Sequence, residues 1–237
     1  MEKRTLDSYQ SFRVPTIRAE SEKKTVRVTS FGTSTLLFDD GEDQIMFDAF
    51  FTRPSFVRTF TQRISSNQEL VQSILRKQEV DRLRAVFVSH SHYDHALDVA
   101  TIANQTGAKV YGSLSTLNIA RGGGVNETQL VEFQTHETYT LGKLRIQVLP
   151  SIHSKPAKVS DNLGKVIDKP LVQPCLQRRF YEGGSYAFRI EHGSTSFLIH
   201  PSFNYLPRQY KKMHADVLFV GIGGFGVAVN CNLKCNT

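Results

Sequence analysis

The chain has 237 residues, enough for one large domain or two small ones and for a sizeable buried core. Its 40% hydrophobic and 22% charged residues are typical of a globular protein and argue against disorder away from the chain ends. The net charge of +7 favours anionic partners only weakly, because the basic residues occur in pairs such as Lys23-Lys24 and form no long block.

Two further features narrow the class of protein. No apolar run approaches the roughly 20 residues of a membrane-spanning helix, and the N-terminal MEKRTLDSYQ lacks the apolar stretch of a secretory signal. We therefore expect a cytoplasmic protein without a membrane partner. The three cysteines are too few, and odd in number, for a disulfide framework, and Cys231 and Cys235 are expected to be free thiols.

The first predicted elements follow a polar arm. Residues 1–24 are polar and charged with little periodicity and are expected to form an N-terminal arm, which leaves 25–237 as one domain. β-branched and aromatic residues bounded by glycine and aspartate then predict strands, and apolar residues at helical spacing predict one helix. The predicted strands are 26–30, 34–40 and 44–50, and the helix is 66–79 with Ser66 or Asn67 as its N-cap.

Strands and helices alternate in the middle of the chain. A buried strand is predicted at 84–89, followed directly by a helix over 91–107 that ends at Gly107. Segment 154–184 lacks periodicity and is predicted to be a long loop, and such loops are often functional. Two packed sheets with helices outside are expected from this order. The other predicted elements are strands at 109–113, 129–134 and 144–150, a helix at 115–124, a hairpin of 185–193 with 195–201, and a strand at 216–224.

The strongest chemical signal is VFVSHSHYDHALD, residues 86–98. Because side chains alternate along a strand, His90 and His92 at the end of one can point the same way, as two ligands of one metal must. Asp94 and His95 follow at the turn and can meet a second metal beside the first. Packing alone does not explain so many titratable groups without a partner charge. Imidazole and carboxylate ligands suit zinc, with manganese or iron as alternatives.

SHSHYDH resembles the H-x-H-x-D-H signature of the metallo-β-lactamase superfamily. FGTSTLLFDDGEDQIMFDAFF at 31–51 looks like that family's opening strands, and LRIQVLPSIHS at 144–154 looks like the strand that delivers its third histidine. The resemblance covers roughly residues 25–224 and is closest to the lactonase-like and phosphodiesterase-like branch. It implies an α/β (α+β) fold, namely a four-layer αββα sandwich.

The resemblance also implies roles for individual residues. His90, His92 and His153 would hold the first metal, and Asp94 and His95 a second. Asp94 would also be the catalytic group that orients the attacking water or takes its proton, and Asp48 would support the site. The implied activity is that of a metal-dependent hydrolase, which uses metal-activated water on a small ester, lactone or phosphodiester.

The sequence departs from the family pattern in two places. Pro201-Ser202 stands where most members carry the aspartate that bridges both metals, and a serine hydroxyl is a poor substitute ligand. His200 is near enough to replace it, although a core residue or one that supports the site is the preferred interpretation. The family also places a histidine late in the chain, whereas this chain closes with VNCNLKCNT, so its C-terminal end is expected to be truncated or replaced. We therefore expect one zinc ion, or two with the second weakly held.

The substrate is predicted only by class. A small molecule, with an anionic group, is the expected partner, and nucleic acid is not expected because the sequence shows no concentrated basic or aromatic patch. Two alternatives stay open, namely an inactive or truncated metal-binding relative and a nuclease of the same superfamily. The candidate substrate-binding residues are Tyr93, Lys155, Arg178, Arg179 and Tyr181.

Overall fold

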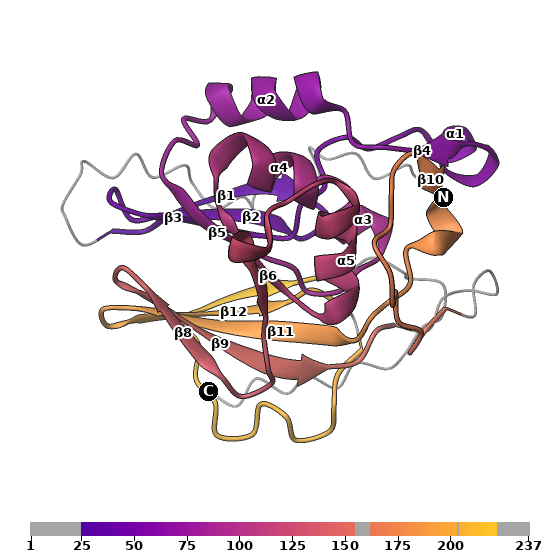
Figure 1. Cartoon of the computed structure of the whole chain (residues 1–237). Coiled ribbons are helices and arrows are strands. Elements are labelled where there is room, and N and C mark those ends of the chain that lie inside the picture. Colours follow the sequence, from indigo (N-terminus) through magenta and orange to yellow (C-terminus); the bar gives the residue numbers. More distant parts are fainter. Residues whose placement is uncertain (1–24, 155–161, 203, 222–237) are drawn as a thin grey trace, which may run out of the picture.

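A computed structural model describes residues 25–154, 162–202 and 204–221. Two β-sheets face each other, and the helices lie on the outer side of the first sheet (Figure 1). The first sheet has six strands in the order β1-β2-β3-β5-β6-β7, and the second has five in the order β13-β12-β11-β9-β8. A separate two-stranded sheet pairs β4 with β10. The expected pair of packed sheets is therefore present.

The first sheet is mixed, with antiparallel strands at one edge and parallel strands over the rest. Its opening strands β1, β2 and β3 pair antiparallel, whereas β3, β5, β6 and β7 pair parallel. The parallel neighbours require crossover connections, and helices supply most of them. The strands are β1 (Arg27–Gly32), β2 (Thr35–Asp39), β3 (Gln44–Phe47), β5 (Leu83–Phe87), β6 (Lys109–Gly112) and β7 (Leu130–Glu132).

The helices begin and end where the local sequence provides caps. Asn67 caps α2 by accepting a 3.0 Å hydrogen bond from the Leu70 amide, and Gly107 ends α4 with a left-handed φ of 74°. The helices are α1 (Phe56–Thr61), α2 (Gln68–Lys77), α3 (Tyr93–Ala96), α4 (Val99–Thr106) and α5 (Leu114–Gly122), with the 3₁₀ turns η2 (Glu127–Gln129) and η3 (Gln177–Arg179).

The second sheet contains the predicted hairpin. β11 and β12 pair antiparallel with His192 opposite Thr195, and β13 adds to β12 in parallel. Residues 204–216 cross its outer face, where Tyr210 and Met213 pack beside Leu198. The remaining bounds are β8 (Thr138–Leu141), β9 (Leu144–Ser151), β11 (Ser185–His192), β12 (Thr195–His200), β13 (Val217–Val220), β4 (Arg63–Ile64) and β10 (Cys175–Leu176).

Strand β5 is buried on both faces, which explains its continuous apolar run. Ala85 and Phe87 face the second sheet and join an aromatic core with Phe47 and Phe188. Val86 faces the helices instead. A strand covered on both sides has little room for polar residues, so the run at 84–89 correctly predicted a buried strand, of which only Arg84 is exposed.

The predicted helix over 91–107 is two helices, α3 and α4, separated at Asp98. The Asp98 amide donates to the Ala49 carbonyl, and its carboxylate accepts hydrogen bonds from the amides of Phe51 at 2.6 Å and Thr52 at 2.8 Å. Ser66 donates a third at 2.6 Å. These long-range bonds hold Asp98 in place and end the first helix, and they tie the segment that follows β3 to the helices.

Several elements of the structure were not predicted, and some predicted segments lie outside the described residues. The loop predicted at 154–184 contains β10 and η3, and the elements α1, β4 and β8 have no counterpart among the predictions. The N-terminal arm, Cys231 and Cys235 lie outside the described residues. Within the described ranges, no helix is long and apolar enough to cross a membrane.

Candidate metal centre

The three histidines expected to hold the first metal lie together. His90 and His92 follow β5 at the edge of the first sheet, and His153 follows β9 of the second. The candidate ligand nitrogens of all three lie within 4.8 Å of one another, and His92 Nδ1 lies 3.2 Å from His153 Nε2. Two facing sheets thus bring together residues that are 61 positions apart in the chain.

Neighbouring polar groups decide which nitrogen of each ring carries the hydrogen. The Asn162 side-chain oxygen lies 3.2 Å from His92 Nε2, and the Ser154 carbonyl lies 2.6 Å from His153 Nδ1. Both acceptors call for an N–H on the side that faces them. The lone pairs of His92 Nδ1 and His153 Nε2 then point at each other, an arrangement that a cation between them stabilises.

His90 completes the set. Its Nδ1 contacts Ser89 Oγ at 3.2 Å, while its Nε2 is buried and has no hydrogen-bond partner among the described residues. A buried polar nitrogen without a partner is costly, and a metal ion would satisfy it. The three nitrogens therefore fit a metal with imidazole ligands, which zinc prefers.

The electrostatics keep two of these rings neutral. Burial lowers the pKa of His90 well below its ordinary value, and the nearby His95, His92 and His153 lower it further. Burial, and next the charge of His153, lower the pKa of His92 to about 4. Imidazole binds a metal only when deprotonated, so both rings are ready to coordinate at neutral pH.

We expect acid to destabilise the metal-free protein. In the window from the ordinary pKa of 6.5 down to about 4, the unfolded chain protonates His92 while the folded chain does not. The unfolded state then binds more protons, so the free energy of unfolding falls as the pH falls through this window. Melting temperatures across this range, measured with a chelator present, check the slope. A His92→Gln variant should show a smaller slope, and an unchanged slope would contradict the assignment.

His95 has a different environment, built around Asp48. Its Nδ1 lies 2.8 Å from Asp48 Oδ2 and 2.8 Å from Ser34 Oγ. Asp48 is buried and also accepts hydrogen bonds from the Ser89 amide at 2.7 Å and hydroxyl at 3.0 Å, and from the Ser34 hydroxyl. Asp48 thus orients His95, with its Nδ1 hydrogen on the carboxylate and its Nε2 free to face the site.

Asp94 and His95 form a second, smaller donor pair. Asp94 Oδ2 lies 3.8 Å from His95 Nε2, and the Asp94 side chain is 39% exposed. Burial lowers the pKa of His95, but the Asp48 and Asp94 carboxylates outweigh it, and the pKa stands above the ordinary value. A proton therefore competes for His95 Nε2 more strongly than for His90 and His92.

The two residues near the expected bridging position are engaged elsewhere. His200 contacts the Tyr210 hydroxyl at 2.6 Å through Nδ1 and the Asn204 carbonyl at 2.9 Å through Nε2. Ser202 Oγ accepts a 2.8 Å hydrogen bond from the Ser154 amide and so braces the residue beside His153. Both ring nitrogens of His200 are therefore engaged in these contacts, and Ser202 acts on the loop that carries His153.

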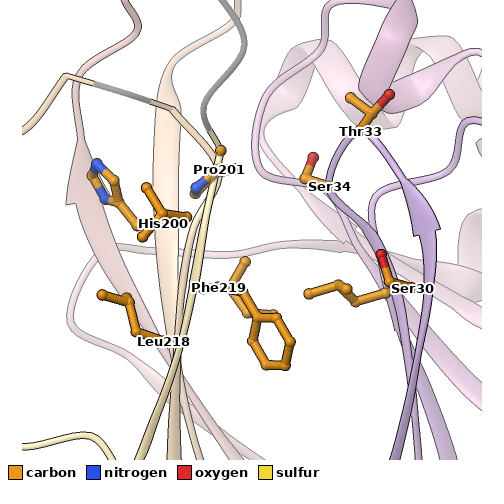
Figure 2. A pocket seen from close by; sticks show the side chains of 11 residues that line it. Ser30, Thr33, Ser34, His200, Pro201, Leu218 and Phe219 are labelled. Atoms are coloured by element: carbon orange, nitrogen blue, oxygen red, sulfur yellow. The ribbon is translucent and has the colours of Figure 1, made fainter. Parts of the chain in front are cut away.

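A cavity of about 240 Å³ adjoins this region, between the β1–β2 turn and strands β12 and β13. Figure 2 shows Ser34 on one wall and Phe219 pointing into the space from the other, with the His200 ring turned away. Ser34 also contacts both Asp48 and His95. Ser34, on one wall of the cavity, is therefore in hydrogen-bond contact with His95 of the second donor pair.

The predicted substrate-binding residues divide into three groups. Tyr93 packs edge-on against Phe50, with ring centroids 5.8 Å apart, and Tyr181 is half-buried against the same core. Arg178 and Arg179 are exposed on η3. Lys155 lies outside the described residues.

Sequence reasoning missed the groups that hold the histidines. Ser34, Ser89, Ser154 and Asn162 all contact the site, yet small polar residues in turns and loops are too common to stand out. The only local signal was the position of Ser89 directly before the histidine motif.

Comparisons with known proteins show what the chain resembles. A family profile described as "Beta-lactamase superfamily domain" matches residues 43–227. A "UPF0173 metal-dependent hydrolase" of Chloroflexus aurantiacus is 34% identical over 74 residues, 31% of this chain and 30% of the relative. Another protein of that name, from Roseiflexus sp., is 24% identical over 189 residues, 77% of this chain and 70% of the relative. The alignment with the Chloroflexus protein thus spans less than a third of that protein's length.

A solved structure shares the fold. A variant of the CmlA beta-hydroxylase superposes with a TM-score of 0.50 and 15% sequence identity, over 81% of this chain and 34% of that chain. At this identity the likeness concerns the arrangement of strands and helices alone.

Proposed function

We propose that this chain, which belongs to the β-lactamase domain superfamily, is a metal-dependent hydrolase that holds its ion on His90, His92 and His153. The mixed α/β fold of the metallo-β-lactamase type expected from the sequence is confirmed. The observation that carries the proposal is the convergence of three imidazole nitrogens, one of them buried without a partner among the described residues. The names of the two relatives, both metal-dependent hydrolases, support the same activity.

The residues of the site have different proposed roles. A bound divalent ion supplies Lewis-acid polarisation and activates water near neutral pH. His90, His92 and His153 hold it, and Asn162 and Ser154 fix the rings that face it. Asp94 is placed to orient the attacking water and to accept its proton, because its carboxylate is partly exposed beside His95.

Zinc is the proposed ion, because three imidazole ligands with an open position match the common catalytic zinc site. Manganese and iron remain alternatives. We propose one firmly held ion. The described residues offer only Asp94 and His95 to a second, and His200 and Ser202 are committed to other contacts.

The proposed substrate is a small ester, lactone or phosphodiester, with an anionic group. Activity of the zinc-, manganese- and iron-loaded protein on one chromogenic member of each class tests this. Hydrolysis of at least one class that a chelator abolishes and the metal restores is the expected result. If the loaded protein binds metal and hydrolyses none of them, the alternative of an inactive metal-binding relative replaces this proposal.

A further inference from the structure

An exposed apolar helix stands beside the two-stranded sheet. On α1, Phe56 is 79% exposed, Val57 67% and Phe60 46%, and the two phenylalanine rings lie 4.7 Å apart. Val172, in the segment that leads to β10, is 65% exposed. Scattered exposed apolar residues are normal, but three on one short helix form a patch that a partner or a surface would cover.

The two chain stretches that form the two-stranded sheet also carry positive charge. Strand β4 lies within residues 49–68 and strand β10 within residues 169–181. Neither of these two stretches contains an aspartate or glutamate. Among the described residues no ion pair involves any of their basic side chains. The stretches hold six basic residues against a net charge of +7 for the whole chain, namely Arg53, Arg58, Arg63, Lys169, Arg178 and Arg179.

The fold brings these two stretches together. β4 pairs with β10, so that Arg63 lies opposite Leu176, and η3 follows immediately with Arg179 at its end. Burial raises the pKa of the Cys175 thiol, while the charges of Arg179 and Arg63 act against it, which places both guanidinium groups near the same sulfur. Figure 1 shows α1, β4 and β10 side by side at one corner of the molecule, outside the two large sheets.

We propose that this corner, formed by α1, β4, β10 and η3, docks on an anionic phospholipid bilayer. Exposed phenylalanines with flanking arginines, and no acidic residue within residues 49–68 and 169–181, match an interface of acyl chains beneath negative headgroups. The surface lies on the membrane and does not cross it, so the chain would have a membrane partner that the sequence alone did not lead us to expect. It is joined to the metal centre, because Phe50 packs on Tyr93 and Thr52 hydrogen-bonds to Asp98. Docking would therefore bring the site close to substrates dissolved in or released from the bilayer.

The chain has no tryptophan, so a single substitution can report the contact. In the full chain carrying Phe56→Trp, we expect a blue shift of the emission on vesicles of equal parts phosphatidylserine and phosphatidylcholine. Vesicles of phosphatidylcholine alone should give little shift. Leu218→Trp is the matched control, because Leu218 is 55% exposed but lies on β13 of the second large sheet, and its emission should not move.

Co-sedimentation with the same vesicles measures how much the phenylalanines and the arginines contribute to binding. Phe56→Ser with Phe60→Ser should weaken binding at least about tenfold, and each arginine replaced in Arg58→Gln with Arg63→Gln should weaken it about fivefold. Arg76→Gln with Lys77→Gln on α2 should leave binding unchanged. These side chains are exposed, and circular dichroism confirms that each variant folds.

Three outcomes would overturn the inference. The first is failure of the wild-type chain to bind vesicles of either composition. The second is equal loss of binding in the α1 and α2 variants, which marks a diffuse charge effect. The third is binding of poly(U) in place of vesicles, which would mark the corner as a nucleic-acid surface. None of these measurements depends on bound metal, so they succeed or fail independently of the hydrolase proposal.

Discussion

Replacing His90 and His92 together by alanine is expected to abolish metal-dependent hydrolysis. The two rings supply two of the three converging nitrogens, and a single imidazole cannot retain the ion. Because a metal contributes several kcal/mol of transition-state stabilisation, and each 1.4 kcal/mol is about tenfold in rate, kcat/KM should fall at least about a thousandfold.

The control is His214→Ala, which removes a histidine whose side chain is 82% exposed and which lies outside the site. It should keep both the metal and the activity. The melting temperature of each protein, measured with a chelator, separates loss of metal from loss of fold. Substantial chelator-sensitive activity in the double variant would contradict the ligand assignment.

Substitution of Asp48 is expected to show which effects are structural and which belong to the site. Asp48 is buried and has a φ of 54°, a left-handed conformation that asparagine tolerates and alanine does not. Asp48→Ala leaves the Ser89 amide and His95 without their acceptor, and the free energy of unfolding should fall by about 3–5 kcal/mol, as when one partner of a buried pair is removed.

Asp48→Asn is the matched variant. Its amide oxygen can still accept from the Ser89 amide, so the fold should survive. Its NH₂ group, however, would face His95 Nδ1 and favour the opposite tautomer, with the hydrogen on Nε2. Activity should then fall about 10–100-fold while the melting temperature changes little. Equal losses of stability in both variants would show that Asp48 acts only on the fold.

The histidine cluster could be predicted because it depends on local spacing and on one strand. His90 and His92 follow β5, a strand recognisable from its apolar run, and they converge as alternation along a strand requires. The position of His153 came from the family resemblance, and the structure places it opposite His92. The roles of these residues as ligands stay predictions until a metal is measured.

The missed elements depend on contacts between distant residues. β4 and β10 are two residues long and pair across more than a hundred positions, so neither has a periodic pattern. The helix break at Asp98 depends on donors at residues 51, 52 and 66, which no window around 91–107 contains. The same holds for His200, whose orientation is set by Tyr210 in a loop that the sequence pattern did not describe.

The basic and aromatic corner could not be predicted from the sequence either. The sequence shows no concentrated patch, because the residues of α1 and η3 are far apart along the chain and each stretch alone is unremarkable. Pairing of β4 with β10 brings the two acid-free stretches together, so the patch exists only in the folded protein.

Metal content tests the central claim most directly. Elemental analysis of the wild-type chain after reconstitution with zinc should give about one ion per chain. His153→Ala should lose that ion, because it removes the ligand contributed by the second sheet. No metal in the reconstituted wild type, or an equal metal content in His153→Ala, would contradict a centre built on His90, His92 and His153.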